Sequence, residues 1–186
     1  VLMFHSFESF INNSTAIDVL VDLKLKGYIN HIGVSVYTND QIEYLLNEDE
    51  ISVVQLPFNL LDNISIRGTL IEQLKVKGKI IHTRSAFLQG LFFKKTSDKN
   101  KIVQKLKSEL EILNQIVEQS NCSMEELALS YCLFQKNIDN VIIGVDSEDH
   151  LNTNIKASTY KIEEDTILKI NNIKTKDLDL LNPSLW

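Results

Sequence analysis

Short apolar runs recur along the chain, and polar turn residues bound each of them. Five runs of four to eight residues, rich in Val and Ile, predict strands that are buried on both faces. These runs are residues 1–4, 32–36, 51–58, 79–83 and 141–145. Between them, longer segments predict helices, most of them from apolar residues that repeat every three to four positions. These segments are residues 15–26, 38–46, 65–77, 101–119, 123–135, 147–156 and 163–173.

Capping boxes mark the start of two of the predicted helices. Gln41 follows Thr38 at a distance of three residues, and Glu126 follows Ser123 in the same way. In this motif the hydroxyl accepts from the backbone of the third residue, whose side chain reaches back to the cap. The helices at 38–46 and 123–135 are therefore predicted with defined first residues.

Strands that alternate with helices favour an α/β fold with a parallel sheet. Among the six glycines there is no Gly-x-Gly-x-x-Gly dinucleotide motif and no P-loop, so barrels and other doubly wound sheets remain. A complete eight-stranded barrel needs at least about 200 residues. This chain has 186 residues and starts inside an apolar run without an initiator Met. We therefore expect a single domain over residues 1–186 that is a fragment of a longer protein.

Charge and composition exclude several classes of partner. The chain has 19 basic and 25 acidic residues, and its net charge of -6 is opposite to that of a nucleic-acid-binding surface. No segment reaches the ~18 consecutive apolar residues of a membrane span, and no secretion signal is visible. Cys122 and Cys132 suit neither a metal pair nor a disulfide framework. We expect a cytoplasmic protein that binds no metal, nucleic acid or membrane.

A polar residue or a glycine lies at or near the carboxyl end of each predicted strand. These residues are His5, Ser35, Gln55, Arg84 and Gly144. Active sites of parallel α/β proteins form at the carboxyl ends of the strands, so five such residues on one rim would make a pocket. Simpler interpretations remain open, with His5 as an ordinary surface or core residue and Arg84 as the ion-pair partner of a nearby carboxylate.

These strand ends lie within longer strings that resemble the second half of the aldo-keto reductase family. The ordered set, rather than any single string, carries the resemblance, and it spans essentially the whole chain. The strings are Met3-Phe4-His5, Ile32-Gly33-Val34-Ser35-Val36-Tyr37, Val54-Gln55-Leu56-Pro57-Phe58-Asn59, Arg84-Ser85-Ala86-Phe87-Leu88-Gln89-Gly90-Leu91, and Val141-Ile142-Ile143-Gly144 followed by Leu151 and Asn154.

The resemblance implies a (β/α)8 TIM barrel of which only the C-terminal five β/α units, strands four to eight, are present. It also implies an NAD(P)H-dependent oxidoreductase that reduces a small-molecule aldehyde or ketone to an alcohol. His5 matches the residue that hydrogen-bonds the substrate carbonyl. Ser35 and Gln55 match residues that hold the nicotinamide carboxamide, which presents both a donor and an acceptor. Arg84 stands where the family usually has a planar side chain stacked on the nicotinamide ring.

The resemblance assigns other residues to the remainder of the cofactor. Those matched to its pyrophosphate and adenosine are Ser85, Phe87, Gly144, Ser147, His150 and Asn154. Asp146, Glu148 and Asp149 lie close to this segment and weaken its attraction for the 2′-phosphate of NADP. The resemblance implies NADPH as the cofactor, and these acidic residues make NADH the alternative. Val36 is a second departure, because the family usually has an Asn there that contacts the carboxamide.

The largest departure concerns the catalytic Asp, Tyr and Lys of the family. They belong to the first three barrel strands, which this chain does not contain. The tyrosines that could substitute lie in predicted helices or loops: Tyr28, Tyr37, Tyr131 and Tyr160. The chain as given is therefore expected to be inactive. The alternative is a non-catalytic relative that serves as an interaction or regulatory subunit, in an oligomer or with a second chain that completes the barrel, because open barrel edges leave strand groups unpaired.

Overall fold

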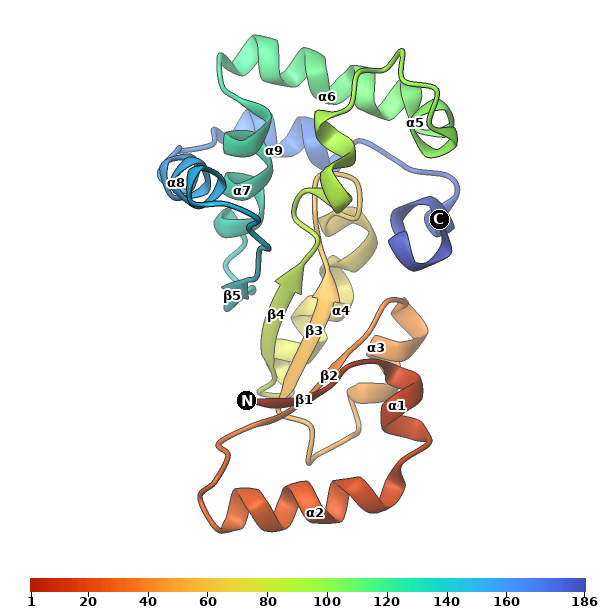
Figure 1. Ribbon diagram of the computed structural model, residues 1–186, viewed down its shortest axis with the longest axis vertical. Coiled ribbons are helices and arrows are strands. Elements are labelled where there is room, and N and C mark those ends of the chain that lie inside the picture. The colour runs from red at the N-terminus through yellow and green to blue at the C-terminus, as the bar shows by residue number, and fades with distance from the viewer.

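A parallel five-stranded sheet forms the centre of the molecule, with its strands in the order of the chain, β1-β2-β3-β4-β5 (Figure 1). The computed structural model describes residues 1–186, the side chain of Ser14 excepted. Every crossover between neighbouring strands contains a helix, as parallel pairing requires. The α/β fold is therefore confirmed. The strands are β1 (Leu2–Phe4), β2 (Ile32–Ser35), β3 (Val53–Pro57), β4 (Ile80–Arg84) and β5 (Asn140–Val141).

Helices occupy most of the chain between and after these strands. They are α1 (Phe7–Ile11), α2 (Ser14–Leu25), α3 (Asn39–Leu45), α4 (Ile64–Val76), α5 (Lys101–Lys105), α6 (Lys107–Ser120), α7 (Met124–Phe134), α8 (Glu148–Ala157) and α9 (Glu164–Asn171), with short 3-10 helices η1 (Leu88–Phe93), η2 (Leu178–Leu181) and η3 (Pro183–Leu185). Both predicted capping boxes are formed, at Thr38 and at Ser123. Figure 1 shows α1 and α2 at one end of the molecule and α5 to α9 towards the other.

The helix predicted over residues 101–119 is interrupted in the structure. Leu106, with φ -99 and ψ 16, separates α5 from α6. The break is invisible in the apolar pattern because Leu106, Leu110 and Leu113 are all buried on the same side. Helix α1 was not expected from the pattern, and it begins where the Ser6 hydroxyl accepts from the backbone N–H of Ser9 at 3.1 Å.

Burial on both faces holds for β2 and for most of β3, is limited to one face in β4, and is wrong for the two edge strands. Leu2 in β1 is 44% exposed. In place of the strand predicted over residues 141–145, β5 comprises only Asn140 and Val141, and Ile142 beyond them is 41% exposed. Edge strands pair on one side only, so their side chains receive less cover than those of β2 and β3.

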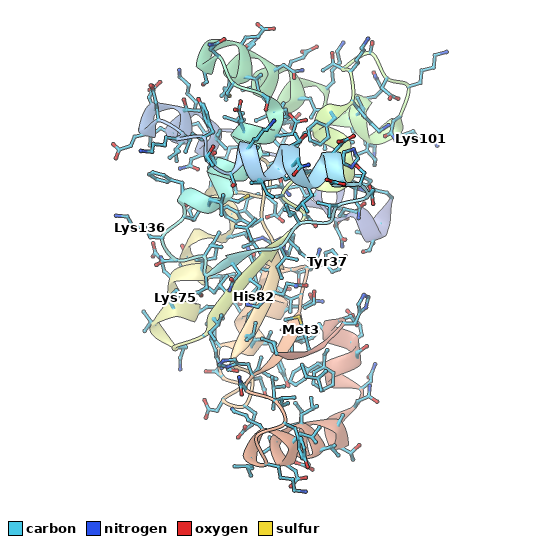
Figure 2. All side chains as sticks on the ribbon, turned by 60° about the vertical axis from the view of Figure 1, so that its left-hand side comes forward. Met3, Tyr37, Lys75, His82, Lys101 and Lys136 are labelled. Atoms are coloured by element: carbon cyan, nitrogen blue, oxygen red, sulfur yellow. The ribbon has the colours of Figure 1, made fainter. Side chains whose placement is uncertain are left out.

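The two faces of the sheet differ in what covers them. On one face Val34, Val54 and Ile81 are fully buried in a single apolar cluster with residues of α3 and α4. On the other face the strand register aligns Ser35 with Gln55 and Gln55 with His82 in a polar row. Figure 2 shows His82 and Met3 on the sheet and Tyr37 just beyond its carboxyl end. The second face carries the candidate chemistry.

Neither the thiols nor the acidic side chains of the described residues form a metal-binding group. Cys122 and Cys132 are free thiols, and burial raises the pKa of Cys132 to about 12. Among the described helices, none has the length and apolar character needed to cross a membrane.

Candidate functional site

Three of the residues singled out in the sequence meet at the carboxyl ends of β2, β3 and β4. The Ser35 hydroxyl donates to Gln55 Oε1 at 3.0 Å, and Arg84 Nε donates to Ser35 Oγ at 3.3 Å. The contact between Ser35 and Gln55 follows from the strand register, which places them side by side. The side-chain nitrogen of Gln55 donates to no acceptor among the described residues. The pair therefore keeps a free amide donor beside a hydroxyl.

Arg84 is held by uncharged groups. Its Nη2 donates to the Val36 carbonyl at 3.1 Å and its Nη1 to the Ser85 hydroxyl at 3.3 Å. The guanidinium carbon lies 4.0 Å from the centroid of the Tyr37 ring, which is a cation–π contact. No carboxylate in the described part of the chain forms an ion pair with Arg84, so the ion-pair interpretation is wrong. Burial lowers the pKa of Arg84, but an arginine remains charged at neutral pH.

The chain leaves β4 through a turn with unusual backbone angles. Ser85, Leu88 and Gln89 have φ values of 64, 45 and 53, in the left-handed region that costs free energy for residues with a side chain. Phe87 lies within this turn, with its ring 5.5 Å from that of Phe93. Backbone N–H groups in such turns often converge and suit an anion. Strain in this position is typical of a ligand-binding loop.

The other residues predicted for the site lie outside this cluster. His5 follows edge strand β1 and is exposed, and Gly144 is exposed beyond β5 at the opposite edge of the sheet. Ser147 caps α8 by accepting from the backbone N–H of His150 at 3.1 Å. Asn154 is buried within α8, at 7% exposure. Hydrogen bonds thus join the central residues to one another, and within the described chain none connects them with the residues at the two edges.

A buried ion pair lies next to the cluster and was not identified from the sequence. Arg67 Nε and Nη2 donate to the two carboxylate oxygens of Asp62 at 2.7 and 2.8 Å. Arg67 also donates to Asn39 Oδ1 at 2.7 Å and to the Tyr37 carbonyl at 2.8 Å. Burial raises the pKa of the Asp62 carboxyl, and the contact with Arg67 opposes that rise. A usable signal existed, because Arg67 falls on the apolar face of the predicted helix with Leu70.

A cavity of about 390 Å³ adjoins the ion pair of Arg67 and Asp62, and its lining reaches Tyr37 but none of Ser35, Gln55 and Arg84. Its size falls within the range of small-molecule sites. Tyr37 connects the two groups, since its ring supports Arg84 and its carbonyl accepts from Arg67. The C-terminal segment forms one wall. The lining residues are Tyr37, Thr38, Asn39, Asp40, Pro57, Asp62, Ile66, Arg67, Leu178, Asp179, Leu181 and Asn182.

Comparisons with known proteins agree on one family. The sequence profile of the Aldo/keto reductase family matches residues 1–175. No curated protein matches the sequence. Among solved structures, aldo-keto reductase AKR11C1 from Bacillus halodurans in its apo form superposes with a TM-score of 0.75 at 20% identity, covering 94% of this chain and 60% of that one. Its holo form gives the same TM-score and identity and is covered over 59% of its length.

Two further structures extend the likeness in fold. MGS-M4, an aldo-keto reductase enzyme from a Medee basin deep-sea metagenome library, has a TM-score of 0.64 at 14% identity, with 95% of this chain and 59% of that one covered. The thermostable aldo-keto reductase Tm1743, in complex with the inhibitor epalrestat, has a TM-score of 0.62 at 18% identity, with 91% and 57% covered. This chain thus spans about 60% of the length of its structural relatives.

Proposed function

Since this chain belongs to the aldo/keto reductase family, we propose that it is the C-terminal part of an NAD(P)H-dependent oxidoreductase that reduces an aldehyde or ketone to an alcohol. The observation that carries the proposal is the cluster of Ser35, Gln55 and Arg84 at the carboxyl ends of three neighbouring strands. This is where active sites of parallel α/β proteins form.

The residues of the cluster fit a nicotinamide. A carboxamide needs both a donor and an acceptor, and Gln55 offers its free amide nitrogen beside the Ser35 hydroxyl. Arg84 presents a planar cation whose position is fixed by three hydrogen bonds. Such a cofactor, when bound, supplies a hydride to the substrate carbonyl. His5 is proposed to hydrogen-bond the carbonyl oxygen of the substrate.

The remaining cofactor contacts are assigned to the turn after β4 and to the start of α8. Ser85 and Phe87 lie in the turn whose left-handed residues orient backbone N–H groups. Gly144, Ser147, His150 and Asn154 are proposed for the adenosine end. NADPH is the proposed cofactor and NADH the alternative, because the acidic residues at 146, 148 and 149 oppose a 2′-phosphate.

We further propose that the five strands correspond to strands four to eight of a (β/α)8 barrel, as one cytoplasmic domain over residues 1–186. The strictly sequential parallel order supports this, as does the share of each relative that the chain covers. The Asp, Tyr and Lys that the family uses for proton transfer belong to the first three strands. This polypeptide alone is therefore proposed to bind cofactor without reducing carbonyls efficiently.

The open edges of the sheet favour a second candidate, in which another chain completes the barrel and this chain acts as an interaction subunit. Edge strands with unpaired N–H and C=O groups invite pairing. Apolar side chains of α8, the helix that follows β5 in the chain, are exposed, among them Leu151 at 43% and Ile155 at 56%. Light scattering on the purified chain distinguishes the candidates. A well-behaved monomer of 21.3 kDa contradicts obligate completion by a second chain.

Nucleotide binding tests the leading proposal. The 186-residue chain is titrated with NADPH and with NADH by isothermal calorimetry, together with Gln55→Leu, which removes the free amide donor. Loss of this donor is expected to weaken binding by about tenfold. Gln115→Leu, an exposed position on α6, is the matched control and should bind as the wild type does. Absence of binding to either nucleotide contradicts the proposal.

A further inference from the structure

Arg84 is a positive charge without a neutralising partner. Its guanidinium hydrogen bonds go to a hydroxyl, a carbonyl and a second hydroxyl, and its face rests on a tyrosine ring. None of these groups carries a net charge. The neighbouring carboxylate of Asp62 binds both Nε and Nη2 of Arg67 instead. The charge of Arg84 is therefore not neutralised by a carboxylate and acts on any ligand that the cluster binds.

This charge is fixed in position and half-buried. Three hydrogen bonds and the Tyr37 ring hold the guanidinium, so it cannot move away when another charge approaches without losing them. Partial burial also reduces screening by solvent, since charges away from bulk water interact more strongly. Ser35 Oγ lies 3.3 Å from Arg84 Nε and 3.0 Å from Gln55 Oε1. A ring held by the Ser35 and Gln55 pair would therefore lie next to the cation.

We propose that Arg84 makes this site distinguish the redox state of its cofactor, binding the reduced nicotinamide more tightly than the oxidised one. The inference rests on the proposed function. An oxidised nicotinamide ring carries a positive charge and a reduced ring carries none, so only the oxidised form is repelled by Arg84. The reduced ring is also electron-rich and suits the face of a guanidinium.

Discrimination of this kind has a benefit and a cost for a reductase. The site captures the reduced cofactor and releases the oxidised one readily. The same repulsion opposes the positive charge that develops on the ring as hydride leaves. Arg84 therefore slows the hydride-transfer step while it speeds release of the oxidised cofactor. Arg84 is in this sense a specificity-determining residue for the cofactor.

The test compares dissociation constants for NADPH and NADP⁺, and for NADH and NAD⁺, measured by calorimetry on the full chain. Within each pair the phosphates and adenosine are identical, so their interactions with other charges cancel in the ratio of oxidised to reduced constants. The wild-type ratio is expected to exceed about ten, because two like charges a few ångströms apart in a partly buried site interact by at least this much.

Three variants assign the ratio to the charge of Arg84. Arg84→Gln keeps a planar amide and removes the charge, and it should lower the ratio about tenfold. Arg84→Lys keeps the charge and should preserve most of the ratio. Lys101→Gln removes a charge from the exposed start of α5, which Figure 2 shows far from the sheet, and should leave the ratio unchanged. Circular dichroism and urea unfolding of each variant verify that the fold is intact.

The outcomes separate this inference from the proposed function. If the nucleotides bind and Arg84→Gln has the wild-type ratio, the inference is overturned while the proposed function stands. If neither member of either pair binds to the wild-type chain, the proposed function is overturned and the inference with it. A ratio that drops equally in Lys101→Gln also overturns the inference, because net charge rather than Arg84 would then be responsible.

Discussion

Two arginines lie on either side of Tyr37 and are held in opposite ways. Arg67 is buried and paired through two hydrogen bonds with Asp62, and its remaining donors reach Asn39 and the Tyr37 carbonyl. Arg84 is half-buried, and its partners are the Ser35 and Ser85 hydroxyls, the Val36 carbonyl and the Tyr37 ring. One positive charge is neutralised inside the protein, and the other is left available.

The difference indicates separate roles for the two regions. A buried charge that is paired and held by four hydrogen bonds connects segments of the fold, here the segment after β2 with the segment between β3 and α4. A charge that neutral groups hold at the carboxyl end of a strand is ready to act on a ligand. We therefore assign Arg67 to stability and Arg84 to binding.

The largest expected effect comes from breaking the ion pair. Asp62→Ala leaves the Arg67 guanidinium buried without a counter-charge, and such losses cost about 3–5 kcal/mol. Arg84→Met, which leaves no charge unpaired, should cost about 1 kcal/mol or less. The free energies of unfolding in urea test both values. Equal losses in the two variants would contradict the separation of roles, and Asp62→Leu combined with Arg67→Met should recover part of the lost stability.

Lys79 sharpens the comparison, because it is a buried cation without a carboxylate partner that lies at the amino end of β4, opposite to the carboxyl ends of the strands. It is 5% exposed and donates to the Glu48 and Ile51 carbonyls, each at 2.6 Å. Lys79→Met leaves both carbonyls without this donor and should cost about 1–3 kcal/mol in urea unfolding. Exposed Lys77→Met is the control. If Lys79→Met also altered nucleotide affinity, position at the strand ends would not explain the role of Arg84.

Ser35→Ala is expected to lower the free energy of unfolding less than Lys79→Met does. Its effect on cofactor affinity is expected to be larger than its effect on stability. The hydroxyl bridges Gln55 and Arg84, and loss of one such group costs about 1 kcal/mol. Arg84 then loses one of the contacts that fix its position. Urea unfolding measures the first effect and NADPH calorimetry the second, with exposed Ser97→Ala as the control. Unchanged NADPH affinity in Ser35→Ala would show that the bridge has no part in the site.

His82 gives the smallest expected effect and reports on the sheet face that carries Arg84. Burial lowers the pKa of His82, and Asp139 opposes this. The unfolded chain then binds more protons than the folded chain at pH values near and below about 6.5, so the stability contribution is lost as the pH falls. Urea unfolding between pH 5 and 8 should show a shallower slope in His82→Gln than in the wild type. An identical pH slope in His82→Gln and the wild type would contradict the lowered pKa of His82 and would mean that water reaches this face of the sheet freely.

The sequence allowed the central residues to be predicted because their positions follow from a simple rule. Ser35 lies near the end of one apolar run, Gln55 lies within the next, and Arg84 follows the third. Parallel strands bring the carboxyl ends of these runs together. Tyr37 was missed, since its contacts depend on how the segment after β2 packs rather than on strand order. Arg67 gave a signal that was not used, because it falls on the apolar face of its predicted helix. The break at Leu106 was missed because the buried stripe continues through it.

The edges of the sheet show a different limit of sequence reasoning. Apolar runs predict strands whether or not a neighbour pairs with both sides. Asn140 and Val141 pair with β4, and no strand of the described chain lies on the other side of β5. The pairing ends after Val141, short of the predicted end of this strand. The placement of His5 and Gly144 relative to the cluster depends on those same edges, and it stays a prediction.

The most direct test of the account observes the Gln55 side-chain amide by nuclear magnetic resonance while ligands are added. The free amide donor beside Ser35 is predicted to receive the carboxamide of the cofactor. Reduced nicotinamide mononucleotide, which lacks the adenosine, should therefore shift the Gln55 side-chain signals in a saturable manner, and adenosine diphosphate should leave them in place. Gln55 signals that ignore the nicotinamide ligand, or that respond equally to both ligands, would contradict the account.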